Sequence, residues 1–152
     1  EDFSAECCLG EARILYGKKI SVDELLTLLL EDRDFYDNSG GGVTLSGGEP
    51  LCQADFVAEV FELCHERGIN TCLDTSGSVI NDEVKMLLSA TDRVLLDIKY
   101  TNQEDYERFV GCSLFSVISF LDLLEDMRVK TTVRQVIIPK TRLLKLTPLE
   151  SG

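Results

Sequence analysis

The sequence predicts an α/β fold in which helices cover a parallel β-sheet, and three observations lead to this expectation. Apolar runs of strand length alternate about four times with segments of helical periodicity. The repeat is roughly 25–40 residues long, which is typical of βα units. Each strand-like run from residue 69 onward is apolar in its middle and polar at its carboxyl end. In parallel β/α folds, barrel or open, ligands bind at that end of the strands.

The helices are predicted from capping signals and apolar spacing. Ser21 precedes a leucine-rich run, and Glu24 stands three positions later, as in a capping box. His65 and Arg67 occupy the last turn of the second helix, and Gly68 follows as a C-terminal cap. The predicted helices cover 21–36, 53–68, 81–91, 102–111 and 114–128.

Four strands are predicted between these helices. They cover 43–46, 69–77, 93–100 and 130–138. The carboxyl ends of parallel strands meet at one edge of a sheet, so polar residues at these ends should lie together. We therefore expect one site to contain Glu49, Asp74, Thr75, Asp97 and Lys99.

Length, charge and hydropathy exclude several classes of function. A chain of 152 residues is one domain or a piece of one. Its 15 basic and 27 acidic residues leave a net charge of −12, which argues against binding nucleic acid or an anionic membrane. The apolar runs are far too short to span a membrane.

The six cysteines are typical of reduced thiols in a cytoplasmic protein. Apart from the adjacent pair Cys7 and Cys8, they lie far apart. The other four fall in apolar periodic segments and are expected to be small core residues: Cys52, Cys64, Cys72 and Cys112. Neither C-x-x-C nor C-x-x-x-C-x-x-C occurs in the sequence.

The stretch 40–51, "GGGVTLSGGEPL", indicates a ligand-binding loop at the end of the first strand. Gly47 and Gly48 leave the main chain bare, so a ligand can approach its N–H and C=O groups. Glu49 adds a carboxylate, and Pro50 stiffens the exit from the turn. Such a loop suits a small ligand that carries an ammonium group. It matches neither a P-loop nor a dinucleotide fingerprint.

Four motifs in succession carry a resemblance to a known family. "GGGVTLSGGEPL", "GINTCLDTSG", "VLLDIKY" and "VRQVIIP" resemble, in this order, motifs of the activating enzymes of glycyl radical enzymes. Within that group, the activating enzymes of pyruvate formate-lyase are the most similar. These are radical S-adenosylmethionine (SAM) proteins. The resemblance covers 18–139, and it implies a partial (β/α)6 barrel, truncated at both ends.

The resemblance also implies which residues bind SAM: Gly47, Gly48, Glu49, Asp74, Thr75, Asp97, Ile98, Lys99 and Arg134. The Gly-Gly-Glu loop would hold the methionine amino group, and Lys99 would pair with the methionine carboxylate. Asp74 and Thr75 would lie near that carboxylate, where Asp74 and Asp97 could also hold a monovalent cation. Arg134 would point into the barrel lumen.

The mechanism implied by the resemblance is cofactor chemistry. A reduced [4Fe–4S] cluster, supplied with electrons by a donor such as flavodoxin or ferredoxin, would cleave SAM to methionine and a 5′-deoxyadenosyl radical. That radical would remove a hydrogen atom from a glycine of a partner such as pyruvate formate-lyase. No side-chain acid or base is needed, so no catalytic residue is assigned.

The sequence departs from the family at both ends. The three-cysteine cluster motif is missing, so the cluster ligands are expected to lie outside this chain, which alone should be inactive. Cys8 resembles the last cysteine of a ferredoxin-like insert. We therefore expect a remnant of that insert at 1–17, a partial radical SAM core at 18–139 and a divergent tail at 140–152.

Two alternatives remain open from the residues. The chain could be a redox-inactive half-barrel that serves as a binding or assembly module for SAM or the partner enzyme. It could also be an unrelated (β/α)-barrel hydrolase or lyase that uses Asp74, Asp97 and Lys99 as acid–base groups. Taken singly, these residues and Arg134 could equally be capping, solvated or ion-paired side chains. In either case the truncated sheet would expose apolar edges near 43–46 and 132–138, which favours self-association.

Overall fold

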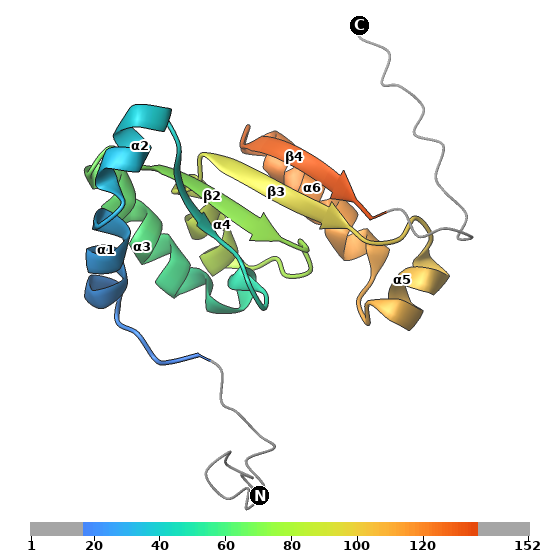
Figure 1. Cartoon of the computed structure of the whole chain (residues 1–152). Helices are drawn as coiled ribbons and strands as arrows, with labels where there is room; N and C mark the ends of the chain where they lie inside the picture. Colours follow the sequence, from blue (N-terminus) through green and yellow to red (C-terminus); the bar gives the residue numbers. More distant parts are fainter. Residues whose placement is uncertain (1–16, 137–152) are drawn as a thin grey trace, which may run out of the picture.

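The structure is a computed structural model that describes residues 17–136. It contains a four-stranded parallel sheet with the strand order β1-β2-β3-β4, as the sequence predicts (Figure 1). The elements are α1 (Val22–Leu30), α2 (Arg33–Ser39), β1 (Gly42–Leu45), the 3₁₀ helix η2 (Pro50–Gln53), α3 (Ala54–Glu66), β2 (Asn70–Thr75), α4 (Asp82–Ser89), β3 (Arg93–Ile98), α5 (Gln103–Phe109), α6 (Leu114–Asp126) and β4 (Lys130–Gln135). The expected insert remnant, apart from Gly17, and the expected tail lie outside the described residues.

The single helix predicted over 21–36 is in fact two helices. Its start is as expected, because Ser21 and Glu24 form the reciprocal capping box. The N–H groups of Glu31 and Asp32 then bond three residues back, to the carbonyls of Leu28 and Leu29. This tightening ends α1, and α2 starts after Asp32 in a new direction.

The two faces of the sheet differ. Along β2 and β3, alternate side chains such as Leu73, Val94 and Leu96 are buried. Helices α3, α4 and α6 lie on this side of the sheet (Figure 1). They contribute fully buried apolar side chains to the core: Val60, Phe61, Cys64, Val84, Leu87, Val117, Phe120 and Leu124. Each fully buried Leu or Phe side chain contributes about 1.5–3 kcal/mol to the free energy of unfolding. The other face carries half-buried or exposed residues, among them Cys72, Asp74 and Asp97.

The expectation that four cysteines are small core residues is confirmed only in part. Cys64 is fully buried, and burial raises the pKa of its thiol. Cys72 and Cys112 are half-buried, and all three are free. The expectation that Cys52 is a core residue is wrong, because this residue lies exposed on η2, whose buried residues are its neighbours Pro50 and Leu51. Cys7 and Cys8 lie outside the described residues.

A cluster of polar side chains, His65, Thr71 and Asp92, connects α3 to the amino ends of β2 and β3. One carboxylate oxygen of Asp92 accepts hydrogen bonds from the Thr71 N–H at 2.8 Å and lies 2.9 Å from His65 Nε2. The Thr71 hydroxyl donates to the Ala90 carbonyl at 3.0 Å. The Thr71 hydroxyl and the Asp92 carboxylate both contact Nε2 of His65, at 3.2 and 2.9 Å. A catalytic proton relay would need one group on each of the two imidazole nitrogens, so this arrangement is not a relay. The cluster is structural.

Among residues 17–136, no helix is long and apolar enough to cross a lipid bilayer.

Strand β1 approaches β2 so closely that its first residue must be glycine. A Cβ atom on Gly42 would lie 1.9 Å from the Asn70 carbonyl oxygen, which is backbone and cannot rotate away. We expect Gly42→Ala to lower the free energy of unfolding by about 3 kcal/mol, because β1 must move off its partner. Gly41→Ala is the matched control, since its Cβ would meet only the Ser39 hydroxyl. It should stay within about 1 kcal/mol of the wild type. Urea denaturation measures both, and equal effects would contradict the close approach.

The hydrogen bonds to Asp92 should make the free energy of unfolding depend on pH. Partial burial alone would raise the pKa of Asp92, but hydrogen bonds from Thr71 and His65 outweigh it and hold this pKa below its usual range. A carboxyl whose pKa is lowered by folding stabilises the native state above its unfolded pKa. That contribution is lost as the pH falls through its folded pKa. The stability difference between the wild type and Asp92→Asn should therefore shrink below about pH 4. A difference that stays constant down to about pH 2.5 would contradict the role of this carboxylate.

Candidate functional site

The carboxyl ends of the four strands surround a cleft of about 360 Å³. It is lined by Ser46, Gly47, Gly48, Glu49, Asp74, Thr75, Ser76, Asp97, Lys99 and Arg134. Eight of the nine residues predicted from the sequence are in this group. The ninth, Ile98, does not line the cleft but packs against the hydrophobic core. Ser46 and Ser76 were not predicted, although Ser76 belongs to the Asp-Thr-Ser-Gly stretch that carried the resemblance.

The loop after β1 is held to the end of β2 by the carboxylate of Glu49. One oxygen accepts hydrogen bonds from the Thr75 hydroxyl at 2.6 Å and from the Leu51 N–H at 3.1 Å. The other accepts from the N–H and the hydroxyl of Ser76, at 2.9 and 2.5 Å. Four donors fill the usual acceptor positions of a carboxylate. Glu49 therefore fixes the loop across the gap between two strands.

Gly47 and Gly48 give this loop its shape. Their φ angles of +83° and +52° lie in the left-handed region that residues with a Cβ rarely adopt. A Cβ atom at either position would have no heavy atom within 4 Å. The two glycines are therefore required by backbone conformation, and they leave open space above the main chain. A ligand in the cleft can reach that backbone directly.

An alternating chain of charges crosses the ends of β2, β3 and β4. Asp97 accepts from the Lys99 ammonium at 2.7 Å and from Arg134 Nε at 2.8 Å. A second nitrogen of Arg134 donates to Asp74 at 2.5 Å. Partial burial alone would raise the pKa of Asp97, but the hydrogen bonds from Lys99 and Arg134 outweigh it and lower that pKa. The hydrogen bonds to Asp97 and to Asp74 raise the pKa of the Arg134 guanidinium. Asp97 and Arg134 are therefore both charged at neutral pH.

Lys99 is positioned by a residue of the core. Its backbone N–H donates to the hydroxyl of Tyr106 at 3.3 Å, and Tyr106 on α5 is fully buried. Burial raises the pKa of this phenol. This contact uses only the main chain of Lys99, whose ammonium group lines the cleft in its pair with Asp97.

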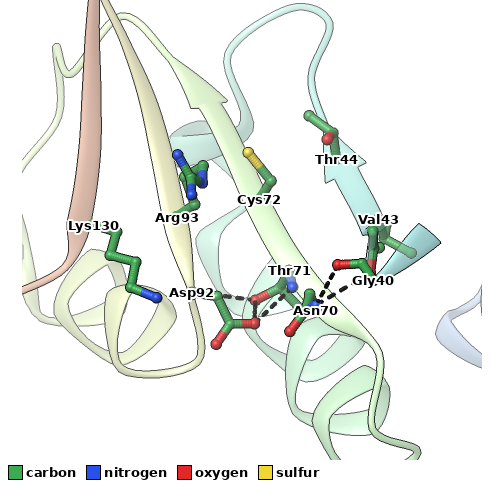
Figure 2. A pocket seen from close by; sticks show the side chains of 11 residues that line it. Gly40, Val43, Thr44, Asn70, Thr71, Cys72, Asp92, Arg93 and Lys130 are labelled. Atoms are coloured by element: carbon green, nitrogen blue, oxygen red, sulfur yellow. Dashed lines mark hydrogen bonds between the residues drawn. The ribbon is translucent and has the colours of Figure 1, made fainter. Parts of the chain in front are cut away.

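A second cleft lies at the amino ends of the strands, with a volume of about 450 Å³ (Figure 2). Its wall includes Thr44, Cys72, Arg93 and Lys130, which follow one another across the sheet from β1 to β4. This cleft is the larger one, but it lies at the end opposite to the predicted residues. Ligands of parallel α/β sheets bind at the carboxyl ends, so the smaller cleft is the candidate site.

The hydrogen bonds of Glu49 make a testable contribution to stability. We expect Glu49→Ala to lower the free energy of unfolding by about 2 kcal/mol, since four donors lose a charged acceptor. Glu59→Ala is a matched control, because Glu59 is exposed on α3. It should change the free energy by less than about 0.5 kcal/mol. Equal effects in urea denaturation would show that the loop is not held in this way.

Comparison with known proteins agrees with this geometry. The family model of the radical SAM superfamily matches residues 7–142. The chain is 41% identical over 125 residues to the pyruvate formate-lyase 1-activating enzyme of Escherichia coli K12, covering 81% of this chain and 51% of that protein. It is 37% identical over 130 residues to the (2S)-3-sulfopropanediol dehydratase activating enzyme of Klebsiella oxytoca, covering 86% and 41%. The chain thus spans about half the length of these relatives.

A solved structure shows the same fold. A domain of the pyruvate-formate lyase-activating enzyme from Bacteroides vulgatus superposes with a TM-score of 0.57 at 22% identity, covering 62% of this chain and 59% of that one. Its likeness supports a partial barrel built from parallel strands and outer helices. The fold agrees with the family match over 7–142, and the motif residues gather at the carboxyl ends of the strands. The family match shows that this chain belongs to the radical SAM superfamily.

Proposed function

We propose that this chain is the SAM-binding part of an activating enzyme that installs a glycyl radical on a partner enzyme. The observation that carries the proposal is the carboxyl-end cleft, in which residues of all four motifs meet. Two relatives are named as activating enzymes of different enzymes, pyruvate formate-lyase and a sulfopropanediol dehydratase. We take pyruvate formate-lyase or a relative as the partner, and the cytoplasm as the location, in accord with the free thiols at Cys52, Cys64, Cys72 and Cys112.

The cleft fits the amino-acid part of SAM. An ammonium group can donate to the bare main chain at Gly47 and Gly48 and to the Glu49 carboxylate. Glu49 has no spare acceptor position, but the Ser76 hydroxyl also lies 3.2 Å from the Ser78 hydroxyl. By turning its single hydrogen to Ser78, Ser76 can free one position on Glu49 for the ligand. The Lys99 ammonium can leave Asp97 to meet the carboxylate of the ligand.

Asp74 and Asp97 play a second part in the proposal. The resemblance implies that they could hold a monovalent cation, and Arg134 bridges the two carboxylates. The charges of the two carboxylates are balanced by two cationic side chains of this protein, Arg134 and Lys99. We propose that Arg134 reorients when SAM binds and then contributes to the wall of the site, while Ile98 supports β3 from the core side.

The residues that the structure describes do not fit the [4Fe–4S] cluster that proteins of this superfamily use. Among residues 17–136, no group of three or more His, Cys, Asp and Glu side chains could hold a metal ion. The full sequence lacks the three-cysteine motif. We propose that the cluster ligands and the contact with an electron donor such as flavodoxin or ferredoxin belong to other parts of the activase.

In the complete enzyme, SAM supplies the radical chemistry. The residues described here bind and orient it, and none acts as an acid or base. Asp97 is held ionised by two cations, so it is no proton donor near neutral pH. The alternative of an unrelated barrel hydrolase or lyase is wrong, because the family match places the chain among radical SAM proteins.

A second candidate function is a redox-inactive module that binds SAM or the partner enzyme. One observation favours it: the described residues form a complete cleft and yet hold no set of cluster ligands. It shares the binding step with the main proposal and differs in needing no cluster.

Calorimetric titration with SAM under anaerobic conditions tests the binding step. We expect the wild type to bind, and Lys99→Met to weaken binding about tenfold or more, because an ammonium–carboxylate pair is lost. Lys85→Met is the matched control, since Lys85 pairs with Asp82 on exposed α4 and lies outside the cleft. Equal affinities of the two variants would rule out the assigned role of Lys99, and a wild type that does not bind would remove the proposal for this chain.

Reconstitution with iron and sulfide tests whether the cluster ligands lie outside this chain. We expect no [4Fe–4S] absorbance from this chain, with SAM binding unchanged. A stable cluster that SAM perturbs would show that the chain carries its own cluster ligands, against the geometry of the described residues.

A further inference from the structure

The carboxylate of Glu49 receives three hydrogen bonds whose direction is fixed. The N–H groups of Leu51 and Ser76 belong to the main chain and can only donate. The hydroxyl of Thr75 accepts from the Gly77 N–H at 3.0 Å and donates to Glu49 at 2.6 Å, so contacts on both sides determine its orientation. Thr75 is also buried. These three donors can hold Glu49 in place both before and after a ligand binds.

The fourth hydrogen bond, from the hydroxyl of Ser76, has an alternative. This oxygen lies 2.5 Å from Glu49 Oε2 and 3.2 Å from the hydroxyl of Ser78. A serine hydroxyl has a single hydrogen, so it can donate to only one of these two acceptors at a time. The carboxylate is charged and nearer, which makes it the preferred acceptor. Ser78 is the acceptor that remains when a ligand takes the place of Ser76 on Glu49.

The two serines are held at this separation by Gly77. Its φ angle of +67° lies in the left-handed region, and a Cβ atom there would lie 2.7 Å from a methyl carbon of Leu96 and 2.9 Å from a ring carbon of Phe120. The main chain between Ser76 and Ser78 is therefore packed against the core. A rotation of the Ser76 O–H bond can exchange its acceptor without any movement of this main chain.

Only one of the two serines is part of the cleft. Ser76 lines it together with Glu49, whereas Ser78 is half-buried and is not among the described residues that form its wall. A ligand that reaches Glu49 therefore contacts Ser76 and not Ser78. Any effect of the Ser78 hydroxyl on ligand affinity has to pass through Ser76.

We propose that Ser78 is a positioning residue for the ammonium group of SAM, and that it acts through the hydroxyl of Ser76. This inference rests on the proposed function and deepens it. When the ammonium group enters, Ser76 turns its hydrogen from Glu49 to Ser78, and one acceptor position of the carboxylate passes to the ligand. No covalent bond changes, and Glu49 and Ser76 keep hydrogen-bond partners in both states.

This exchange lets one carboxylate serve both the loop and the ligand. A charged ammonium donor compensates for the hydroxyl donor that Glu49 loses. Without Ser78, the displaced hydrogen of Ser76 would have no protein acceptor, and ligand binding would weaken by the cost of about one hydrogen bond. A ligand that lacks the ammonium group leaves Ser76 on Glu49, so Ser78 has no effect on its binding.

Calorimetric titration of Ser78→Ala with SAM tests this role. We expect binding to weaken roughly three- to tenfold, which corresponds to one hydrogen bond. The des-amino analogue of SAM keeps the carboxylate but has no ammonium group, and it should bind to the wild type and to Ser78→Ala with equal affinity. Ser89→Ala is the matched control, because the Ser89 hydroxyl bonds to the Lys85 carbonyl on α4, outside the cleft. This control should bind SAM like the wild type.

A second variant tests whether Ser78 acts through Ser76. Ser76→Ala should bind SAM at least as tightly as the wild type, because no hydroxyl has to leave Glu49. In that background, the further change Ser78→Ala should have no effect on SAM affinity. A purely structural contribution of Ser78 would instead weaken binding in both backgrounds. Far-UV circular dichroism and urea denaturation confirm that each variant is folded.

Each other result would overturn the inference in a specific way. Wild-type SAM affinity in Ser78→Ala would show that Ser76 needs no second acceptor. Equal weakening for SAM and for its des-amino analogue would assign the effect to the shape of the loop. Weaker binding by Ser76→Ala would show that its hydroxyl contacts the ligand and does not compete with it. These three results leave SAM binding by the wild type intact, whereas a wild type that binds no SAM would remove the proposed function and this inference together.

Discussion

The cleft depends on one carboxylate, that of Glu49. The loop after β1 contains two glycines in left-handed conformations, and such a backbone has little intrinsic preference for one shape. Four hydrogen bonds to Glu49 restrict it, and three of them come from Thr75 and Ser76 at the end of β2. The loop is thereby fixed relative to the neighbouring strand. The side chain of Glu49 thus holds in place the main chain of Gly47 and Gly48, which a ligand can approach closely.

At the ends of the other strands, each carboxylate is likewise held by hydrogen bonds from neighbouring side chains. Asp97 at the centre binds Lys99 along its own strand and Arg134 across to β4, and Arg134 reaches Asp74 on β2. A half-buried carboxylate without a partner would be costly, and here each acid has a cation. The three strands are linked by charges that also form the wall of the cleft. A ligand that enters must exchange partners within this network, so binding and the stability of the sheet edge are coupled.

Much of this could be predicted from the sequence, and the exceptions have physical reasons. The alternation of elements and the polar strand ends predict a parallel sheet and a shared site, because both follow from local pattern and from the rule that parallel strands end together. The break at Glu31 and Asp32 was missed, because no glycine or proline stands between the leucine run and Phe35 and Tyr36. Cys52 was misplaced because its apolar neighbours, Pro50 and Leu51, are buried while it faces out. Ser76 and the partners of Arg134 depend on distances between strands, and the sequence carries no direct signal for these.

Proteins of the superfamily bind SAM and supply it with an electron, and the residues proposed for the first task lie together along this chain. Every residue proposed to bind SAM comes from β1 to β4 or the loops that follow these strands, and these strands are consecutive neighbours in the sheet. The binding cleft can therefore form within one contiguous stretch of chain, whereas the described residues offer no set of ligands for a cluster. Recognition of the amino-acid part of SAM requires hydrogen bonds and charges, which a half-barrel can supply at its rim. The electron that cleaves SAM has to come from a metal centre, and its position relative to this cleft must be set by a different segment. The proposed binding of SAM thus needs only the segment from β1 to β4, which supplies all the residues assigned to it.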